Sequence, residues 1–258
     1  MSADVGPLSA DPGRRRGAAL RTVALSAGYG GRPVVHGVSI DVAPGHVVSV
    51  VGPNGSGKST LLKGIVGAVK VLSGQVLLGD EDITNQPPEF VARAGVGYVP
   101  QVDDVFGPLS VRENLEMGGY LLRGKEIPAR IEKVVSYFPA LGPLLGRRAS
   151  KLSGGERKML AMGRVLMLEP ALFVLDEPTA NLAPTIARRL LHEHVRQLSV
   201  DGASVLIVEQ RAKAVLEISH HTYVLAGGRL RMAGRPAELV DSPTFVESFL
   251  GGGRTLTS

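Results

Sequence analysis

The chain has 258 residues, which is enough for one large domain or two small ones with a hydrophobic core. Its net charge of +5 is spread along the sequence, so charge does not favour a nucleic-acid-binding protein. The absence of cysteine excludes disulfides, thiolate catalysis and Cys-based zinc sites. Trp is also absent, and no run approaches the roughly 18 consecutive apolar residues of a transmembrane helix. We therefore expect a soluble, intracellular protein.

The two ends of the chain carry the weakest structural signals. Residues 1–18 are polar and aperiodic and lack an apolar secretory segment, so we expect a disordered tail without a signal peptide. Residues 251–258 begin with three glycines and predict a second loose tail. Residues 19–250 are expected to form one domain.

Between these tails, short apolar strands alternate with helical patterns. Val47–Val51 is a β-branched run that stops at Gly52 and predicts a buried strand. Apolar residues at helical spacing from Ser59 to Val69 predict a helix. The pattern then predicts, in order, a hairpin over 75–83, a short helix over 89–93 and a strand over 96–99.

The middle of the chain, from about 110 to 167, is mostly helical in pattern, with breaks at Gly118-Gly119, Gly142-Pro143 and Gly154-Gly155. Two further apolar strands follow at 172–175 and 204–208, with a helix between them at 184–198. A closing hairpin is predicted at 223–232. Buried strands that alternate with helices predict an α/β fold with a mainly parallel sheet. We expect the helical middle, about 102–165, to be an inserted subdomain.

One segment fits the phosphate-binding pattern G-x-x-x-x-G-K-[ST], with a chance probability of roughly 1% in a chain of this composition. Its glycines can turn backbone N–H groups towards phosphate, and the following helix presents its positive end. Lys58 can reach the β- and γ-phosphates, and the Ser59 hydroxyl can bind Mg²⁺. The candidate nucleotide-binding residues are Gly52, Asn54, Gly55, Ser56, Gly57, Lys58, Ser59 and Thr60.

An acidic pair follows the apolar strand at 172–175. Asp176 at its carboxyl end is a candidate Mg²⁺ ligand, and Glu177 can orient or deprotonate an attacking water. Alone, the pair is more typical of a solvated acidic turn. Together with the phosphate loop, it favours a nucleotide-hydrolysing site.

The segment Leu152-Ser153-Gly154-Gly155-Glu156 resembles the signature motif of ATP-binding-cassette (ABC) ATPases. Physically it is a capped helix start that bares backbone N–H groups, and Glu156 lies 21 residues before Glu177, a spacing similar to the family's. The resemblance runs from about Leu20 to Gly251. It implies a RecA-like P-loop NTPase core with an antiparallel β subdomain and the inserted α-helical subdomain, and a signature that contacts ATP bound to a second subunit.

Two further roles come from the resemblance. Tyr29 looks like the aromatic residue that stacks on adenine, although an ordinary hairpin tyrosine is the alternative. Gln101 looks like the glutamine that joins Mg²⁺ to the helical subdomain, although a polar residue closing a strand is the alternative. The implied metal ligands are therefore Ser59, Gln101 and Asp176.

Two positions depart from the general family pattern. Ala183 stands where most members carry an aspartate, and Gln210 stands where most carry a histidine that contacts the γ-phosphate. An amide can hydrogen-bond phosphate or water but cannot carry a proton as imidazole does. Glu177 is therefore the expected base, with Lys58 and Gln210 as its catalytic partners.

Both departures, with Met117-Gly118-Gly119, resemble the LivF-type ATP-binding subunits of branched-chain amino-acid importers; urea and short-chain amide importers share them. This implies an ATPase at the cytoplasmic face of the membrane. Its implied partners are permeases that dock on residues between Gln101 and Asn114, including Phe106, a second ATP-binding subunit (a heterodimer rather than a homodimer), and indirectly a substrate-binding protein. No nucleic-acid partner is implied.

Three rivals remain. A stand-alone P-loop kinase or GTPase would lack the signature at 152–156. A non-transport ABC ATPase acting on DNA or ribosomes usually carries a long coiled coil or two cassettes, which do not fit in 258 residues. An exporter cassette, such as one for lipopolysaccharide, is disfavoured only by Ala183 and Gln210.

Overall fold

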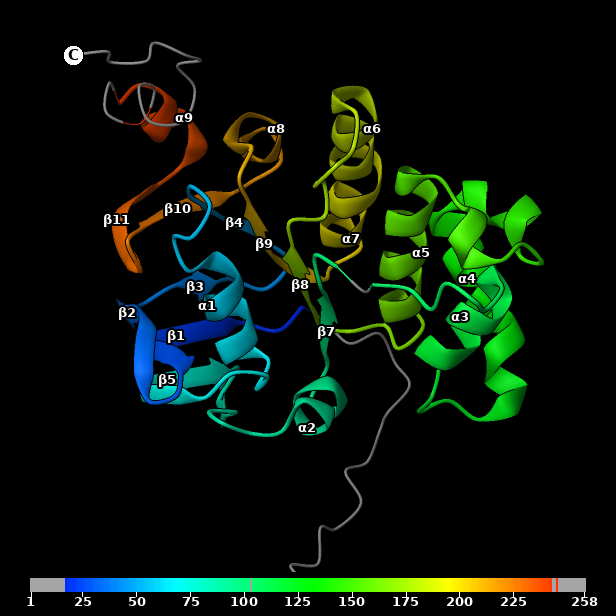
Figure 1. Ribbon diagram of the computed structural model, residues 1–258, viewed down its shortest axis with the longest axis horizontal. Coiled ribbons are helices and arrows are strands. Elements are labelled where there is room, and N and C mark those ends of the chain that lie inside the picture. The colour runs from blue at the N-terminus through cyan, green and yellow to red at the C-terminus, as the bar shows by residue number, and fades with distance from the viewer. Residues whose placement is uncertain (1–16, 103, 243–244, 246–258) are drawn as a thin grey trace, which may run out of the picture.

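The computed structural model describes residues 17–102, 104–242 and 245. The expectations of tails at 1–18 and 251–258 fall outside these residues, apart from 17 and 18. Two sheets and a separate group of helices make up the molecule, with α1 (Lys58–Ile65) between the sheets (Figure 1).

The larger sheet has the strand order β11-β10-β4-β9-β8-β7. All neighbouring pairs are parallel except β10 and β11, which form an antiparallel hairpin at one edge. The bounds are β4 (Val47–Val51), β7 (Val96–Val99), β8 (Leu172–Asp176), β9 (Ser204–Glu209), β10 (His221–Ala226) and β11 (Arg229–Gly234). The predicted strands and closing hairpin are therefore confirmed.

Alternate residues of the central strands enter two different cores. On β4, Val48 and Val50 pack in the core that contains α1, whereas Val47 and Val51 pack in the core on the opposite face. All four are almost fully buried. Burial on both faces explains why these strands are continuous apolar runs in the sequence rather than alternating ones.

The smaller sheet is antiparallel, in the order β2-β1-β5-β6 with β3 also paired to β1. Its strands are β1 (Leu20–Tyr29), β2 (Arg32–Val38), β3 (Asp41–Val42), β5 (Val71–Leu78) and β6 (Glu81–Asp82). The predicted α/β class with a mainly parallel core and an antiparallel part is confirmed. No strand was predicted for β1 to β3. In β1, register shifts break the regular alternation of buried and exposed residues.

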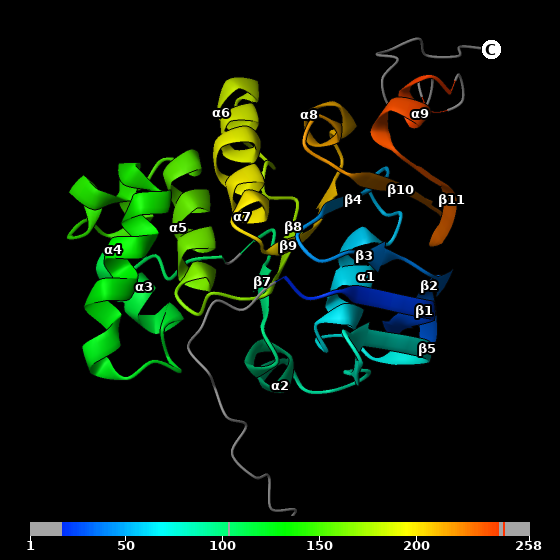
Figure 2. The same cartoon turned by 180° about the vertical axis from the view of Figure 1, so that it is seen from behind.

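The remaining helices cover the larger sheet or belong to the helical group between β7 and β8, where the sequence predicts a mostly helical segment. Both cartoon views place α3 to α5 on the side away from the antiparallel sheet, with α6 beside α5 (Figures 1 and 2). In the described part of the chain, no helix has the length and apolarity to cross a membrane. The bounds are α2 (Pro88–Arg93), α3 (Val111–Gly118), α4 (Ile127–Tyr137), α5 (Gly154–Leu166), α6 (Pro184–Arg189), a π-helical segment (Leu190–Val195), α7 (Arg196–Val200), α8 (Ala212–Leu216) and α9 (Pro236–Val240), with 3₁₀ turns at Gly124–Glu126, Pro139–Leu144 and Ala149–Lys151.

The helix predicted to reach Val69 ends earlier, at Ile65. Gly67 adopts the left-handed conformation (φ +75°), and the N–H groups of Ala68 and Val69 both donate to the carbonyl of Lys63. A left-handed glycine just after the last turn stops a helix while satisfying its free carbonyls. The apolar spacing thus continues past the point where the glycine ends the helix.

Candidate functional site

Four of the predicted site residues follow the carboxyl ends of four adjacent strands. Gly52 follows β4, Gln210 follows β9, Glu177 follows β8, and Gln101 lies two residues after β7. These strands are neighbours in the order β4-β9-β8-β7, and all are parallel. Because the carboxyl ends of parallel strands meet at one edge of a sheet, residues far apart in the sequence converge there.

The loop between β4 and α1 has the backbone that phosphate binding requires. Gly55 and Gly57 have φ angles of +74° and +99°. A Cβ atom at Gly57 would lie 2.7 Å from Cγ1 of Val35, so the position has no room for a side chain. The Ser56 Oγ is buried without a hydrogen-bond partner among the described residues, and a phosphate oxygen would satisfy it.

Lys58 folds back over this loop. Its Nζ donates to the carbonyls of Gly52 at 2.9 Å and Pro53 at 3.2 Å, and it lies 3.2 Å from Oε1 of Glu177. Lys58 and Glu177 are both buried. A buried cation of this kind, in contact with both the loop and the acidic pair, provides the charge complementarity that a polyphosphate needs.

Asp176 lies at the end of β8 with each carboxylate oxygen held by a hydroxyl. Ser59 Oγ donates to Oδ1 at 2.9 Å, and the Tyr98 hydroxyl donates to Oδ2 at 3.2 Å. Burial raises the pKa of Asp176, and these hydrogen bonds oppose the rise. Burial also raises the pKa of the Tyr98 phenol, which therefore stays a donor at neutral pH. Ser59 and Asp176 supply neighbouring oxygen donors of the type that Mg²⁺ prefers.

Glu177 is held in a strained backbone conformation. Its φ is +45°, and its N–H donates to the carbonyl of Val208 on the neighbouring strand β9. The side chain contacts Lys58 through Oε1 and accepts a hydrogen bond from Gln101 Nε2 at Oε2, at 2.9 Å. Non-glycine residues in such conformations cluster at functional sites, where the surroundings hold them.

A small polar cavity of about 230 Å³ opens beside Glu177. Asn54, Gln101 and Gln210 line it, as predicted site residues, so the structure brings all of them to the acidic pair. Arg211 lines it as well and was missed, although it directly follows Gln210 in the sequence.

The hydrogen bonds of two buried acidic residues near the site, Asp104 and Glu209, were also not predicted from the sequence. Lys158 on α5 donates to Asp104 Oδ2 at 2.8 Å and to the carbonyl of Gln101 at 2.7 Å. Glu209, the last residue of β9, accepts from both the N–H and the hydroxyl of Thr179, and burial raises the pKa of its carboxyl. No local pattern signals these contacts, because their partners are 30 to 57 residues apart.

The signature segment forms a capped helix start, as its pattern predicts. Ser153 Oγ accepts from the Glu156 N–H, and Glu156 Oε2 accepts from the Ser153 N–H, which leaves Gly154 and Gly155 in the first turn of α5. Ser153 to Glu156 line a second cavity of about 940 Å³, and Leu152 is buried beside it. They do not line the cavity at Glu177, although Asn181 lines both cavities.

Ala183 occupies the position before the first residue of α6. It lines the signature cavity and supplies no side-chain cap to that helix. An aspartate there would cap the helix, so this departure removes one hydrogen bond from the start of α6.

Tyr29 ends β1 and is 54% exposed. It does not line the cavity at Glu177. The hairpin that carries it is linked to the phosphate loop through Gly228, in the turn between β10 and β11: His36 N–H donates to Gly228 O, and Gly228 N–H donates to Ser56 O. Thr60, the other remaining predicted contact, is buried in α1.

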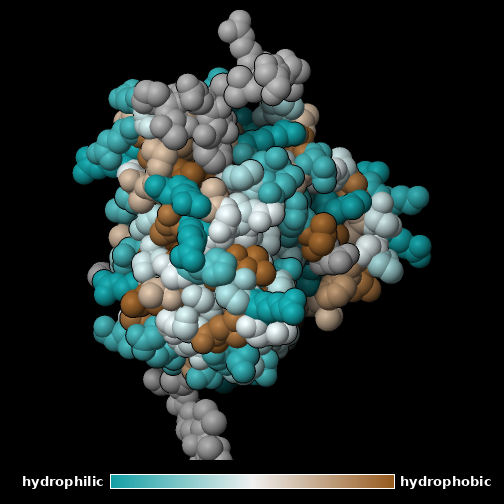
Figure 3. All heavy atoms as spheres, turned by 60° about the vertical axis from the view of Figure 1, so that its left-hand side comes forward, coloured by the Kyte–Doolittle hydropathy of each residue, from teal (hydrophilic) through white to brown (hydrophobic). Residues whose placement is uncertain are grey.

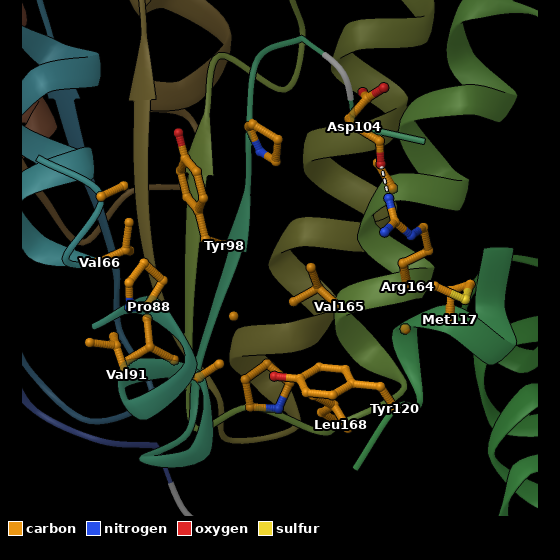
Figure 4. Close-up of a pocket in the computed structure, with 18 of the residues that line it drawn as sticks. Val66, Pro88, Val91, Tyr98, Asp104, Met117, Tyr120, Arg164, Val165 and Leu168 are labelled. Carbon is orange, nitrogen blue, oxygen red and sulfur yellow. Dashed lines mark hydrogen bonds between the residues drawn. The ribbon is translucent and has the colours of Figure 1, made fainter. Parts of the chain in front are cut away.

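A third cavity, a mainly apolar groove of about 550 Å³, lies between β7, α2 and α5 (Figure 4). Phe106 is 44% exposed at this groove, and its ring lies 4.4 Å from the guanidinium carbon of Arg164. Met117 and Tyr120 are also exposed along it. The apolar residues on the face shown in Figure 3 form small separate patches among polar ones, which is ordinary for a protein surface.

Comparison with known proteins gives consistent results. The family model described as ABC transporter matches residues 35–180. The probable branched-chain amino acid transport ATP-binding protein LivF of Archaeoglobus fulgidus is 41% identical over 233 residues, covering 90% of this chain and 98% of that protein. The high-affinity branched-chain amino acid transport ATP-binding protein BraG of Pseudomonas aeruginosa is 38% identical over 228 residues, covering 88% and 97%.

A solved structure agrees with these sequence relatives. The ADP conformation of MJ1267, an ATP-binding cassette of an ABC transporter, superposes with a TM-score of 0.81 at 32% identity. The match covers 91% of this chain and 99% of that one, so the likeness extends through both sheets and the helical group.

Proposed function

Since this chain belongs to the ABC transporter family, we propose that it is the ATP-hydrolysing subunit of an importer for branched-chain or other hydrophobic amino acids. One observation carries the site assignment: Lys58, Gln101 and Glu177 make direct contacts at the edge where the parallel strands end. The charge, the amide and the carboxylate that ATP hydrolysis requires are thus assembled within one chain.

The contacts support a role for each group. The phosphate loop and Lys58 would hold the β- and γ-phosphates. The side-chain oxygens of Ser59, Gln101 and Asp176 would hold Mg²⁺, which would neutralise charge on the phosphates. Glu177 takes the proton of the attacking water. Gln210, on the same cavity as Glu177, donates a hydrogen bond to that water or to a phosphate oxygen.

We propose that each ATP site is completed by the signature segment of a second subunit. Asn181 lines both the signature cavity and the cavity at Glu177, but none of Ser153 to Glu156 lines the cavity at Glu177. This supports a signature that acts on nucleotide held by a second ATP-binding subunit. The free N–H groups in the first turn of α5 would then face the γ-phosphate across the interface. The subfamily resemblance favours a heterodimer over a homodimer.

The groove in Figure 4 is the proposed docking site for the permease subunits at the cytoplasmic face of the membrane. Its exposed apolar residues, Phe106, Met117 and Tyr120, suit the apolar face of a short helix. Asp104 also lines the groove and is linked to Gln101 through Lys158, so the groove adjoins the segment that contacts Glu177.

The hydrolytic role of Glu177 is tested with Glu177→Gln, which removes the base but keeps the shape of the side chain. We expect turnover to fall roughly 100-fold or more while ATP binding is retained. Glu132→Gln, at an exposed position on α4, is the matched control and should keep the parent's turnover. Wild-type turnover by Glu177→Gln would remove Glu177 from this role.

The cargo is tested by uptake. Cells that lack this gene should lose uptake of labelled leucine, isoleucine or valine, and the parent gene should restore it where Glu177→Gln does not. Loss of urea or amide uptake with intact leucine uptake would assign the related importer instead. The composition of the purified complex, with one kind of ATPase or two, distinguishes a homodimer from a heterodimer.

A further inference from the structure

Tyr98 makes two kinds of contact at once. Its hydroxyl donates to Oδ2 of Asp176 at 3.2 Å, and its ring lines the apolar groove. Figure 4 shows the ring at the groove wall, with the hydroxyl directed away from Pro88 and Val91. Tyr98 is half-buried and Asp176 is buried, so water competes weakly for the carboxylate.

The sheet sets this geometry. In the parallel pair of β7 and β8, Tyr98 is in register with Val174, two residues before Asp176. A side chain as long as tyrosine, leaning towards the carboxyl end of its strand, spans those two residues. The contact therefore arises from rigid neighbouring strands and not from a loop.

The other oxygen of the carboxylate is held by Ser59, which itself belongs to the phosphate loop. Asp176 is buried and has a hydroxyl donor on each oxygen. If Tyr98 is removed, Ser59 remains as one donor, and the carboxylate can rotate about its last bond. A metal-binding carboxylate that is free to rotate loses the preorganisation on which affinity depends.

We propose that Tyr98 is a positioning residue for magnesium binding, whose hydroxyl fixes the carboxylate of Asp176 in the orientation that holds the ion on bound nucleotide. The inference depends on the proposed role of Asp176 as a magnesium ligand. It adds a residue that contacts neither nucleotide nor metal and acts through that carboxylate.

The test uses Tyr98→Phe in the full chain, because this change removes one oxygen and keeps the ring that lines the groove. The readout is the affinity for a fluorescent, non-hydrolysable ATP analogue, measured in EDTA and at increasing Mg²⁺ concentration. We expect the half-saturating Mg²⁺ concentration to rise about tenfold, as is typical when an outer partner of a metal ligand is lost. The affinity for the analogue in EDTA should stay within about twofold of the parent's.

Tyr223→Phe is the matched control. Its hydroxyl accepts a hydrogen bond from the Asp41 N–H on the antiparallel sheet, so this variant also loses one tyrosine hydrogen bond, away from the site. We expect its Mg²⁺ dependence to match the parent's. An equal shift in Tyr223→Phe would mean that the effect comes from general destabilisation, and would overturn the proposal.

Asp176→Asn distinguishes the role of Tyr98 from the role of Asp176 in magnesium binding. If Asp176→Asn abolishes the Mg²⁺ dependence while Tyr98→Phe superimposes on the parent, the role of Tyr98 is refuted and the magnesium site stands. If neither variant changes the Mg²⁺ dependence, the magnesium role of Asp176 fails, and that of Tyr98 fails with it.

Discussion

Lys158→Met tests whether the buried ion pair under Gln101 stabilises the chain. Lys158 and Asp104 are 2.8 Å apart, and their side chains are only 9% and 6% exposed. Methionine matches the lysine side chain as far as Cε and lacks only its charged ammonium group, so the Asp104 carboxylate stays buried without this partner. Breaking a buried pair in this way costs about 3–5 kcal/mol.

The position of Arg164 places the expected loss at the lower end of that range. Its Nη1 donates to the backbone carbonyl of Asp104 at 2.6 Å, so a second cation remains beside the carboxylate. We therefore expect a loss of about 3 kcal/mol in the free energy of unfolding. In a chain of this length, that loss lowers the melting temperature by roughly 6–12 °C.

Thermal and denaturant unfolding of four proteins form the assay: the parent, Lys158→Met, Asp104→Leu and the double variant. The double variant removes both charges and should recover much of the stability that Lys158→Met loses, because no buried charge is left unpaired. A loss below about 1 kcal/mol in Lys158→Met, or a double variant that is no more stable than this single variant, would refute the reasoning.

Three further outcomes follow from the site. Gly57→Ala should lose nucleotide binding in a fluorescence titration, because alanine is strained at φ +99° and its Cβ would meet Val35; normal affinity would contradict this. Ser153→Ala should lower the free energy of unfolding by about 1 kcal/mol, because the helix cap is lost, and Ser110→Ala should do the same in the capping box of α3. Only Ser153→Ala should also reduce ATP turnover. An equal reduction in both variants would refute a functional signature. Asp176→Asn should melt at a higher temperature than the parent at pH 7 in EDTA. Burial raises the pKa of the Asp176 carboxyl above its usual value of 3.8, so the ionised carboxylate destabilises the fold. The gain in melting temperature should therefore vanish as the pH falls below 3.8, where the carboxyl is protonated in both the folded and the unfolded chain. A gain independent of pH would contradict the assignment.

The residues proposed to contact nucleotide could be picked out from the sequence because each belongs to a contiguous run with its own local pattern. The phosphate loop connects an apolar strand to a helix, and the acidic pair ends another strand. Parallel pairing then brings the strand ends to one edge without further information. That is why Glu177 and Gln210 share a cavity although 33 residues separate them.

The residues that the sequence did not reveal act through contacts between distant segments. Tyr98 and Asp176 are 78 residues apart, and Lys158 and Asp104 are 54 apart. Tyrosine in a strand and lysine in a helix are each typical of a half-exposed surface, so neither residue type signals its role. Only the sheet order and the packing of α5 against the segment after β7 bring these partners together.

These contacts link the signature helix α5 to Glu177 within one chain. Gln101 donates to Glu177 through its side chain, while its own carbonyl accepts from Lys158 on α5, the helix whose first turn is the signature. A shift of α5 that keeps the Lys158 hydrogen bond must therefore move the backbone of Gln101, and with it the amide that holds the carboxylate of Glu177. For this reason Lys158→Met should loosen the carboxylate of Glu177, the proposed base, as well as the fold. The turnover of this variant should then fall further than its folded fraction.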